Sequence, residues 1–243
     1  MIEILKPEIF QKYNVESGVT LRNILNFPPY GFSISKADIW SDDEIESNRC
    51  LLSEQINIKR RNFGFQKQTH SDIIRYINSD NNVIFESDGI YTNEKGFFLS
   101  VSIADCAAVL IYDHVKQVVT AVHSGWRGTQ QGIVPKALTE LSKVYGSKPE
   151  NLIVYISPAA GGENYEVGYD VAQYFPNSSR QISHNRYLYD NKNEIILQLT
   201  ECGVLSRNIE KSEICTIQDL NFHSFRRDGK YSGRMSAFIG ITG

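Results

Sequence analysis

Three apolar runs follow one another in the middle of the chain, and they constrain its fold more than any other feature. They are GFFLSVSI at 96–103, AAVLIYD at 107–113 and QVVTAVH at 117–123. Each has the length and composition of a β-strand, and the short DHVK link between the last two favours an antiparallel hairpin. Cys106 and His123 stand at matching ends of the two runs that this hairpin pairs. We therefore expect their side chains to meet.

The other expected elements mix strands and helices without regular alternation. Apolar residues at helical spacing, with a Ser cap at 41 and closing glycines at 146 and 203, predict helices over 41–56, 133–146 and 192–203. Further strands are expected over 30–40, 63–70, 151–157, 213–217 and 236–241. This order favours an α+β sheet sandwich over a doubly wound parallel sheet. No linker-like segment divides the chain, so residues 1–243 are expected to form one domain.

The composition excludes several classes of function. The 243 residues carry a net charge of −3 without a basic stripe, so no nucleic-acid partner is expected. No run of 18 apolar residues predicts a membrane span, and the N-terminus lacks the pattern of a signal peptide. The four cysteines suggest neither a disulfide framework nor a CxxC zinc knuckle. A reduced, cytoplasmic setting is the expectation.

Three potential metal ligands, His70, Cys106 and His123, each end a strand-like run or begin a turn. A catalytic zinc ion takes three protein ligands and keeps one position open. Two imidazoles and a thiolate suit zinc, and they also suit the softer Cu(I) ion. The chain has no HExxH motif, and the spacing alone leaves open a buried structural thiol and histidines that cap strand ends.

Glycines bracket Trp126 and Arg127 in the segment HSGWRGT (123–129), which precedes the expected helix at 133. Glycines let the backbone approach a ligand, and Arg127 has the forked geometry that binds phosphate or carboxylate. An ordinary strand-to-helix turn with a locally paired arginine explains the pattern equally well.

Three further segments carry candidate polar residues. Arg226, Arg227 and Arg234 lie in SFRRDGKYSGR (224–234). This segment either binds an anion through its arginines, as a second anion site, or forms a solvated loop. Tyr165 follows the glycine pair of ISPAAGGENYEVG (156–168), a loop after an expected strand. Asp105, directly before the cysteine, is placed to orient a ligand, to act as a base or to cap a turn.

Taken together, the motifs resemble the YfiH-like family, also labelled laccase-domain or multicopper polyphenol oxidoreductase proteins, and described as purine nucleoside phosphorylases. The resemblance extends from about residue 63 to the C-terminus. It rests on the segments QTHSDII, SDGIYTN, SIADCAAVLIYD, AVHSGWRGT, ISPAAGGENYEVG, YDNKNEIILQLTECGV and ICTIQDLNFHSFRRDGKYSGRM. The pairing of ADC with HSGWRGT at this spacing is its most specific part. The loop at 162–164 departs from the family pattern, which leaves the substrate range open.

The resemblance implies a mixed α/β/β/α sandwich, similar to the deamidase domain of cytotoxic necrotizing factor toxins. It implies that His70, Cys106 and His123 bind a metal, usually zinc, with copper as the alternative. The implied activity is phosphorolysis of adenosine, inosine and S-methyl-5'-thioadenosine, which is a glycosyltransferase reaction, together with adenosine deamination, a hydrolase reaction. An older family label is laccase-type polyphenol oxidase, and some bacterial members are described as peptidoglycan-editing enzymes.

Within this reading, Arg127 and Arg227 are the candidates for binding phosphate, Tyr165 for binding substrate and Asp105 for carrying a proton. The nucleoside and phosphate are the expected partners, and a monomer and a homodimer are equally compatible with the sequence. One rival is a cysteine hydrolase with Cys106 as nucleophile and His123 as base. Two others are a laccase-like copper oxidase, for which five histidines are few, and a non-enzymatic purine- or partner-binding module.

Overall fold

The hairpin at the centre of the fold is formed by β7 (Ala107–Asp113) and β8 (Val118–Ser124), as the sequence predicts. The structure, a computed structural model, describes residues 1–35, 37 and 39–242. Every residue of both strands is buried. Alternate side chains enter different hydrophobic clusters, with Leu110 in one and Val109 in the other. Strands buried on both faces have no need of polar alternation, which explains the continuous apolar runs.

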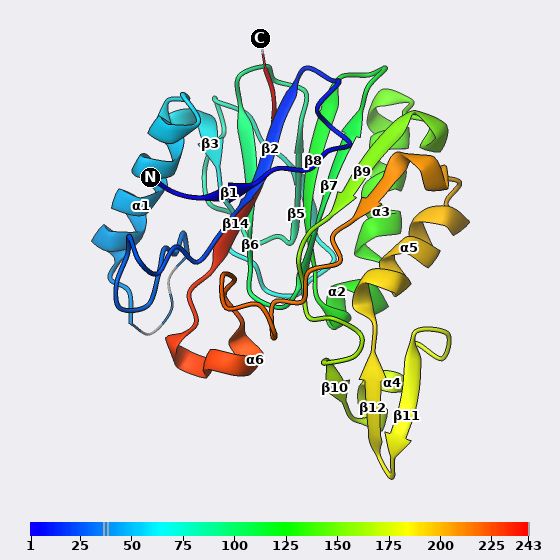
Figure 1. Cartoon of the computed structure of the whole chain (residues 1–243). Helices are drawn as coiled ribbons and strands as arrows, with labels where there is room; N and C mark the ends of the chain where they lie inside the picture. Colours follow the sequence, from blue (N-terminus) through cyan, green and yellow to red (C-terminus); the bar gives the residue numbers. More distant parts are fainter. Residues whose placement is uncertain (36, 38, 243) are drawn as a thin grey trace.

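A six-stranded sheet extends the hairpin on both sides. Its order is β13 (Ile209–Lys211), β9 (Leu152–Ile156), β7, β8, β5 (Gly89–Thr92) and β4 (Ile74–Tyr76). The helices α3 (Ile133–Tyr145) and α5 (Asn191–Glu201) cover its outer face (Figure 1), where Leu138, Leu141 and Ile195 join the apolar cluster of the sheet. The apolar residues whose spacing predicts these two helices are therefore the residues that pack on the sheet.

A five-stranded sheet packs against the other face of the first. Its order is β1 (Ile4–Leu5), β2 (Val15–Thr20), β14 (Met235–Ile241), β6 (Phe98–Ile103) and β3 (Phe63–Gly64). Val101 and Ile239 meet Leu110 and Tyr155 between the two sheets. The helix α1 (Asp42–Gln55), capped by Ser41, packs on the far side of this sheet (Figure 1). The layers are helix, sheet, sheet and helices, so the expected α/β/β/α sandwich is confirmed.

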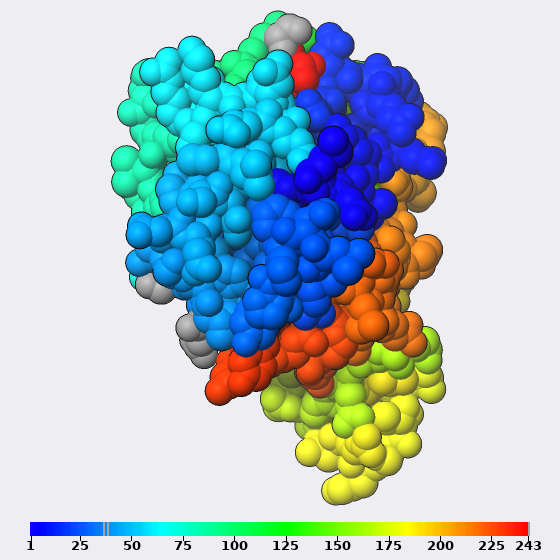
Figure 2. All heavy atoms as spheres, turned by 60° about the vertical axis from the view of Figure 1, so that its left-hand side comes forward, coloured from blue at the N-terminus to red at the C-terminus, as the bar shows by residue number. Residues whose placement is uncertain are grey.

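A smaller sheet with one short helix projects from the sandwich beside the C-terminal part of the chain (Figures 1 and 2). Its elements are β10 (Glu166–Val167), β12 (Arg186–Tyr189), β11 (Ser179–Ser183) and α4 (Tyr169–Ala172). Val171, Phe175 and Tyr189 form its core, and Trp126 and Tyr165 pack against that core. The projecting sheet thus supports two aromatic residues of the segments that the sequence marks as functional.

Short elements complete the chain. They are α2 (Trp126–Gln130), α6 (Phe225–Asp228), η1 (Arg60–Asn62), η2 (Pro149–Asn151), η3 (Ser206–Asn208) and η4 (Gly229–Tyr231). Within the described residues, no helix has both the length and the apolar character needed to cross a membrane.

The predicted strand over 30–40 is wrong for its described residues, which form turns, bends and irregular backbone; residues 36 and 38 lie outside the described part of the chain. Side chains of α1 bind the backbone here, since Asn48 donates to the Ser33 carbonyl and Arg49 to the Ile34 carbonyl. These carbonyl groups therefore bond to side chains, while the N–H groups of Phe32 and Ile34 donate to single backbone carbonyls of Arg22 and Arg234, and no continuous ladder forms.

Two other predicted strands are shorter or displaced. Within 63–70 only Phe63 and Gly64 are strand residues, and the side chain of Gln68 pairs with the Ser102 backbone in place of a ladder. Within 213–217 Cys215 forms only an isolated bridge, and the strand lies upstream, at β13. At both places the contact with a neighbouring backbone is reduced to an isolated bridge, Lys67 with Glu86 and Cys215 with Ala159, so no continuous strand forms.

Candidate metal centre

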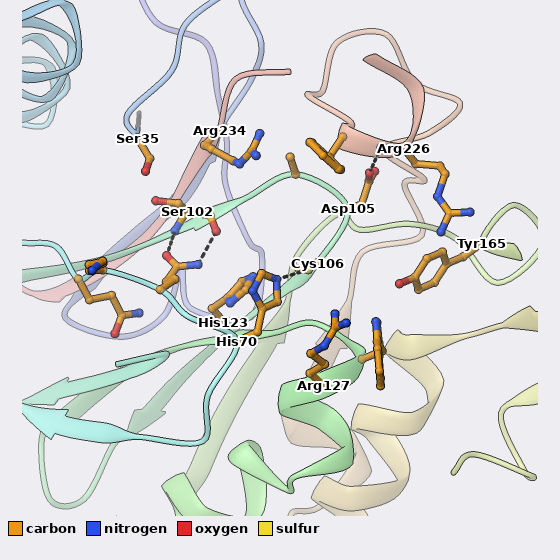
Figure 3. A pocket seen from close by; sticks show the side chains of 16 residues that line it. Ser35, His70, Ser102, Asp105, Cys106, His123, Arg127, Tyr165, Arg226 and Arg234 are labelled. Carbon is orange, nitrogen blue, oxygen red and sulfur yellow. Dashed lines mark hydrogen bonds between the residues drawn. The ribbon is translucent and has the colours of Figure 1, made fainter. Parts of the chain in front are cut away.

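His70, Cys106 and His123 converge at one end of the central hairpin (Figure 3). One potential ligand atom from each residue lies within 4.8 Å of those of the other two. The Cys106 Sγ stands 4.0 Å from the Nε2 of His70, and the two imidazole rings meet edge to face with centroids 5.0 Å apart. His123 is buried, Cys106 is partly buried and His70 is exposed. The cluster is thus reachable from solvent on the His70 side.

Strand register explains why Cys106 and His123 meet. Ala108 pairs with His123 and Ala107 with Ser124 across β7 and β8, so Cys106 falls opposite Gly125. A Cβ on Gly125 would lie 2.6 Å from the Cys106 Sγ and 3.5 Å from Cδ2 of His70. The glycine therefore makes the close approach of thiol and imidazole possible.

His70 reaches the cluster through an unusual backbone turn. Its φ is +58°, in the left-handed region, which non-glycine residues adopt at a cost. The carboxylate of Asp88 compensates by accepting hydrogen bonds from the backbone N–H groups of Thr69, His70 and Ser71. Asp88 also accepts from Nδ1 of His123, at 2.8 Å. Sequence reasoning passed over Asp88, although it lies in the segment SDGIYTN and directly precedes a strand that pairs with β8.

The charges of the cluster are mutually stabilising. Burial raises the pKa of the Cys106 thiol, but the neighbouring His123 and His70 outweigh this effect and the pKa is lowered. Burial lowers the pKa of His123, but the Cys106 thiolate and the Asp88 carboxylate outweigh it and the pKa is raised. Burial would also raise the pKa of Asp88, yet the hydrogen bonds from His123 and Ser71 bring it to about 2. Cys106 is accordingly favoured as the thiolate, the form that binds metals.

The donor set fits a metal ion. Around a tetrahedral zinc, an imidazole nitrogen and a thiolate sulfur lie about 3.6 Å apart, given bond lengths of about 2.1 and 2.3 Å. The 4.0 Å between Cys106 and His70 needs only a small closing movement. Since Nδ1 of His123 is bound to Asp88, its Nε2 is the ring nitrogen left for an ion. These three residues are the possible holders of one metal ion in the described part of the chain.

A pocket of about 570 Å³ opens over the cluster. Arg127, on the first turn of α2, lines it with its guanidinium 4.2 Å from the centre of the Trp126 ring. Among the described residues this guanidinium has no hydrogen-bond or ion-pair partner. The Tyr165 hydroxyl points toward the cluster (Figure 3), and burial and the nearby Cys106 raise the Tyr165 pKa to about 12. Arg127 and Tyr165 therefore place a cation and a neutral hydroxyl in the pocket beside the candidate ligands.

The two arginines of α6 point to different places. Arg226 lines the pocket, and its guanidinium lies 5.2 Å from the centre of the Tyr165 ring. Arg227, the sequence candidate for phosphate, instead donates to the backbone carbonyls of Thr216 and Phe222 and to its neighbour Asp228. The structure thus does not bring Arg227 into the pocket lining. A sequence with two adjacent arginines gave no means of telling which one faces the site.

Asp105 lines the pocket with its carboxylate already engaged. One oxygen accepts from the Thr216 hydroxyl at 2.7 Å and the other from the backbone N–H of Arg226 at 2.6 Å. Its φ of +80° places it in the left-handed region immediately before Cys106. The carboxylate therefore ties the start of α6 to the turn that carries the candidate thiolate ligand.

The fold and the donor set define a class, an α/β/β/α sandwich with a candidate mononuclear metal centre at the end of its central hairpin. Residues 31–242 match the family model described as multi-copper polyphenol oxidoreductase laccase. The chain belongs to this family, and the resemblance noted from its motifs is confirmed.

Named relatives and a solved structure agree with this membership. A purine nucleoside phosphorylase of Clostridium acetobutylicum is 36% identical over 205 residues, which cover 81% of this chain and 84% of that protein. The purine nucleoside phosphorylase YlmD of Bacillus subtilis is 30% identical over 217 residues, covering 82% and 78%. The crystal structure of the hypothetical protein YfiH of Bacillus licheniformis matches with a TM-score of 0.90 at 27% identity, covering 98% of this chain and 96% of that one.

Proposed function

We propose that this protein is a metal-dependent purine nucleoside phosphorylase that acts on adenosine, inosine and S-methyl-5'-thioadenosine and also deaminates adenosine. The observation that carries the proposal is the convergence of His70, Cys106 and His123 beneath a pocket that also contains Arg127. The names of the relatives support the reaction class. Zinc is the proposed metal, because two imidazoles and a thiolate match its preferred ligands.

Arg127 is proposed to bind phosphate. A guanidinium without a protein partner binds an oxyanion through two parallel charge-assisted hydrogen bonds at little reorganisation cost. Trp126 holds the guanidinium from one face. Arg226 is a further cation of the pocket lining and takes the place that the sequence gave to Arg227, whose guanidinium donates to carbonyl groups and Asp228.

The remaining roles concern protons and the reacting atoms. When bound at the cluster, zinc would supply a Lewis acid and lower the pKa of a bound water toward about 7, which deamination requires. The Tyr165 hydroxyl stays neutral because its pKa is raised to about 12, so it can donate a hydrogen bond to a substrate oxygen or nitrogen. Asp105 holds the start of α6 in place; proton transfer by its carboxylate stays a prediction.

The test is incubation of the zinc-loaded protein with adenosine, with and without phosphate, followed by chromatography of the products. Phosphorolysis predicts adenine and ribose 1-phosphate only when phosphate is present. Deamination predicts inosine without phosphate, and inosine together with its phosphorolysis product hypoxanthine when phosphate is present. Removal of the metal by a chelator should abolish both. Binding of adenosine without any turnover would contradict the proposal and favour a binding module.

Arg127→Ala should raise the phosphate KM by about 10- to 100-fold, the effect of losing charge-assisted hydrogen bonds worth about 1.5–3 kcal/mol. The matched control is Arg180→Ala, which removes an exposed arginine of the projecting sheet that pairs with Glu163. An unchanged phosphate KM in the Arg127 variant would remove this residue from the phosphate role.

A second candidate is a cysteine hydrolase, such as a peptidoglycan-editing enzyme. The arrangement that favours it is the series Cys106, His123 and Asp88, in which a carboxylate orients the imidazole beside a thiolate. His70 has no part in that chemistry. His70→Ala and metal removal should therefore leave a hydrolase active, whereas they should inactivate the phosphorylase. Alkylation of Cys106 would stop either enzyme and does not separate them.

Laccase-type oxidation, the activity in the family description, has less support in the ligands. A trinuclear copper site and a blue-copper site need many histidines. Only His70 and His123 belong to the cluster of possible metal ligands among the described residues. His223 lies outside this cluster; its ring is buried and hydrogen-bonded to the Phe32 carbonyl.

A further inference from the structure

Asp88 is a buried carboxylate behind the candidate metal centre that the proposed chemistry does not use. It has no exposed surface, so no substrate reaches it. Its two oxygens nevertheless accept from five donors: the backbone N–H groups of Thr69, His70 and Ser71 at 3.1, 3.1 and 2.7 Å, the Ser71 hydroxyl at 2.7 Å and Nδ1 of His123 at 2.8 Å. The donors belong to both segments that carry imidazole ligands.

The bond to His123 fixes which ring nitrogen faces the cluster. A carboxylate accepts only from a protonated nitrogen, so Nδ1 carries the hydrogen and the lone pair of a neutral ring lies on Nε2. The backbone adds a second tie, because the His123 N–H donates to the Asp88 carbonyl at 2.7 Å. The imidazole of His123 is thereby held in both tautomer and orientation.

The bonds to residues 69–71 fix the other imidazole. Three successive backbone N–H groups point at one carboxylate, which shapes the turn around the left-handed His70. Without an acceptor these partly buried donors would lack partners, and the unfavourable φ of His70 would have no compensation. The ring of His70 stands at the cluster because this turn aims it there.

We propose that Asp88 is a positioning residue that sets both imidazole ligands at once, through the tautomer of His123 and the backbone turn of His70. The inference rests on the proposed metal site. Its consequence is that metal affinity depends on a residue that never touches the ion. Outer partners of metal ligands commonly contribute about 10- to 100-fold to affinity.

The test is zinc affinity, measured by competition with a chromophoric chelator, in Asp88→Asn and in a matched control. The control is Asp113→Asn, because Asp113 is equally buried and accepts the backbone N–H groups of Val115 and Lys116 at the opposite end of β7. Both variants replace a buried carboxylate by an amide of the same shape. Urea unfolding of both variants separates a change in metal affinity from a loss of folding stability.

The expected result is a zinc Kd raised by about 10- to 100-fold in Asp88→Asn and unchanged in Asp113→Asn. The visible absorption of the Co²⁺-loaded protein, which reports ligand geometry at the ion, should change only in the Asp88 variant. Equal affinities and equal spectra in the wild type and Asp88→Asn overturn the inference. If the wild type binds neither zinc nor cobalt, the metal site itself is overturned. The titration of the wild type distinguishes this failure from a failure of the role of Asp88.

Ser71→Ala is the second variant, for the case in which Asp88→Asn does not fold. It removes one side-chain donor to Asp88 and leaves the three backbone donors in place. The zinc Kd should rise by less than in the Asp88 variant, within the about 10-fold that one hydrogen bond can contribute. A folded Ser71→Ala protein with wild-type zinc affinity and cobalt spectrum would count against the role of Asp88.

Discussion

The candidate metal centre depends on one residue that has no side chain. Gly125 has a φ of −79°, which any residue can adopt, so an alanine there is disfavoured only by space. Its Cβ would stand 2.6 Å from the Cys106 Sγ, closer than two such atoms can lie. We expect Gly125→Ala to displace the thiolate and lower zinc affinity by about 10- to 100-fold. Chelator competition measures the change, and circular dichroism checks that the fold is kept.

Gly128→Ala provides the control for that variant, since it alters the other glycine of the same segment. Its Cβ would meet the Cγ2 methyl of Ile133 at 3.3 Å, and no candidate ligand side chain is among its close neighbours. Because this contact does not involve the side chains of the candidate ligands, zinc affinity should stay at the wild-type level. An equal loss in both variants would show that the contact with Cys106 is not the cause.

At the scale of elements, sequence pattern succeeded where packing is regular. The strands β7 and β8 are continuous apolar runs buried on both faces, and the helices α3 and α5 have apolar residues at helical spacing on the face that packs on the sheet. It failed at 30–40 and 63–70, where the backbone bonds to side chains distant in sequence, such as Asn48. Local pattern contains no information about such partners, because they are fixed only when the chain has folded.

The short helix α6 brings an aromatic residue to the mouth of the pocket. Phe225 is 55% exposed, lines the pocket and has the guanidinium of Arg234 5.4 Å from its ring centre. A planar purine can stack on such a ring, so Phe225→Leu should raise the adenosine KM by about 2- to 10-fold. This factor corresponds to the about 0.5–1.5 kcal/mol that an aromatic pair contributes in addition to the burial of apolar area. The phosphate KM should not change. Steady-state kinetics with each substrate varied in turn measures both.

Tyr174→Leu is the matched variant for Phe225. Tyr174 is 51% exposed near α4 of the projecting sheet and does not line the pocket. Its replacement should leave both KM values unaltered. If Phe225→Leu likewise leaves the adenosine KM unaltered, the base does not stack on α6.

At the scale of the whole molecule, the sequence predicts best the part of the site that the β7–β8 hairpin builds. The meeting of Cys106 and His123 follows from strand pairing, whereas no pairing of predicted strands indicates that His70 joins them; His70 is a candidate through its ligand chemistry and the family motif. Asp88 could not be assigned, because its role depends on how two separate segments close around it. Arg226 and Arg227 are adjacent in sequence, and only the carbonyl groups around the second determine which one reaches the pocket.

His223 hydrogen-bonds to Phe32 and Gly233, which are far apart in the sequence. Its burial should make the stability of the protein depend on pH. The ring is fully buried; its Nε2–H donates to the Phe32 carbonyl at 2.9 Å, and its Nδ1 accepts the Gly233 N–H at 3.1 Å. Burial lowers the His223 pKa to about 4, the Phe32 carbonyl opposes this shift, and the positive charge of Arg22 adds to it. The folded protein therefore keeps this ring neutral at pH values where an unfolded chain protonates it.

The unfolded chain takes up a proton at His223 near pH 6.5, whereas the folded chain does so near pH 4. The contribution of His223 is thus complete above about pH 6.5 and is lost as the pH falls toward 4, by about 3 kcal/mol in the free energy of unfolding. His223→Gln keeps a donor for Phe32 but cannot titrate, so this variant should be less stable at pH 7 and should lose less stability between pH 6.5 and 4.5. Urea unfolding at several pH values measures both slopes, and parallel slopes would mean that other groups cause the acid sensitivity.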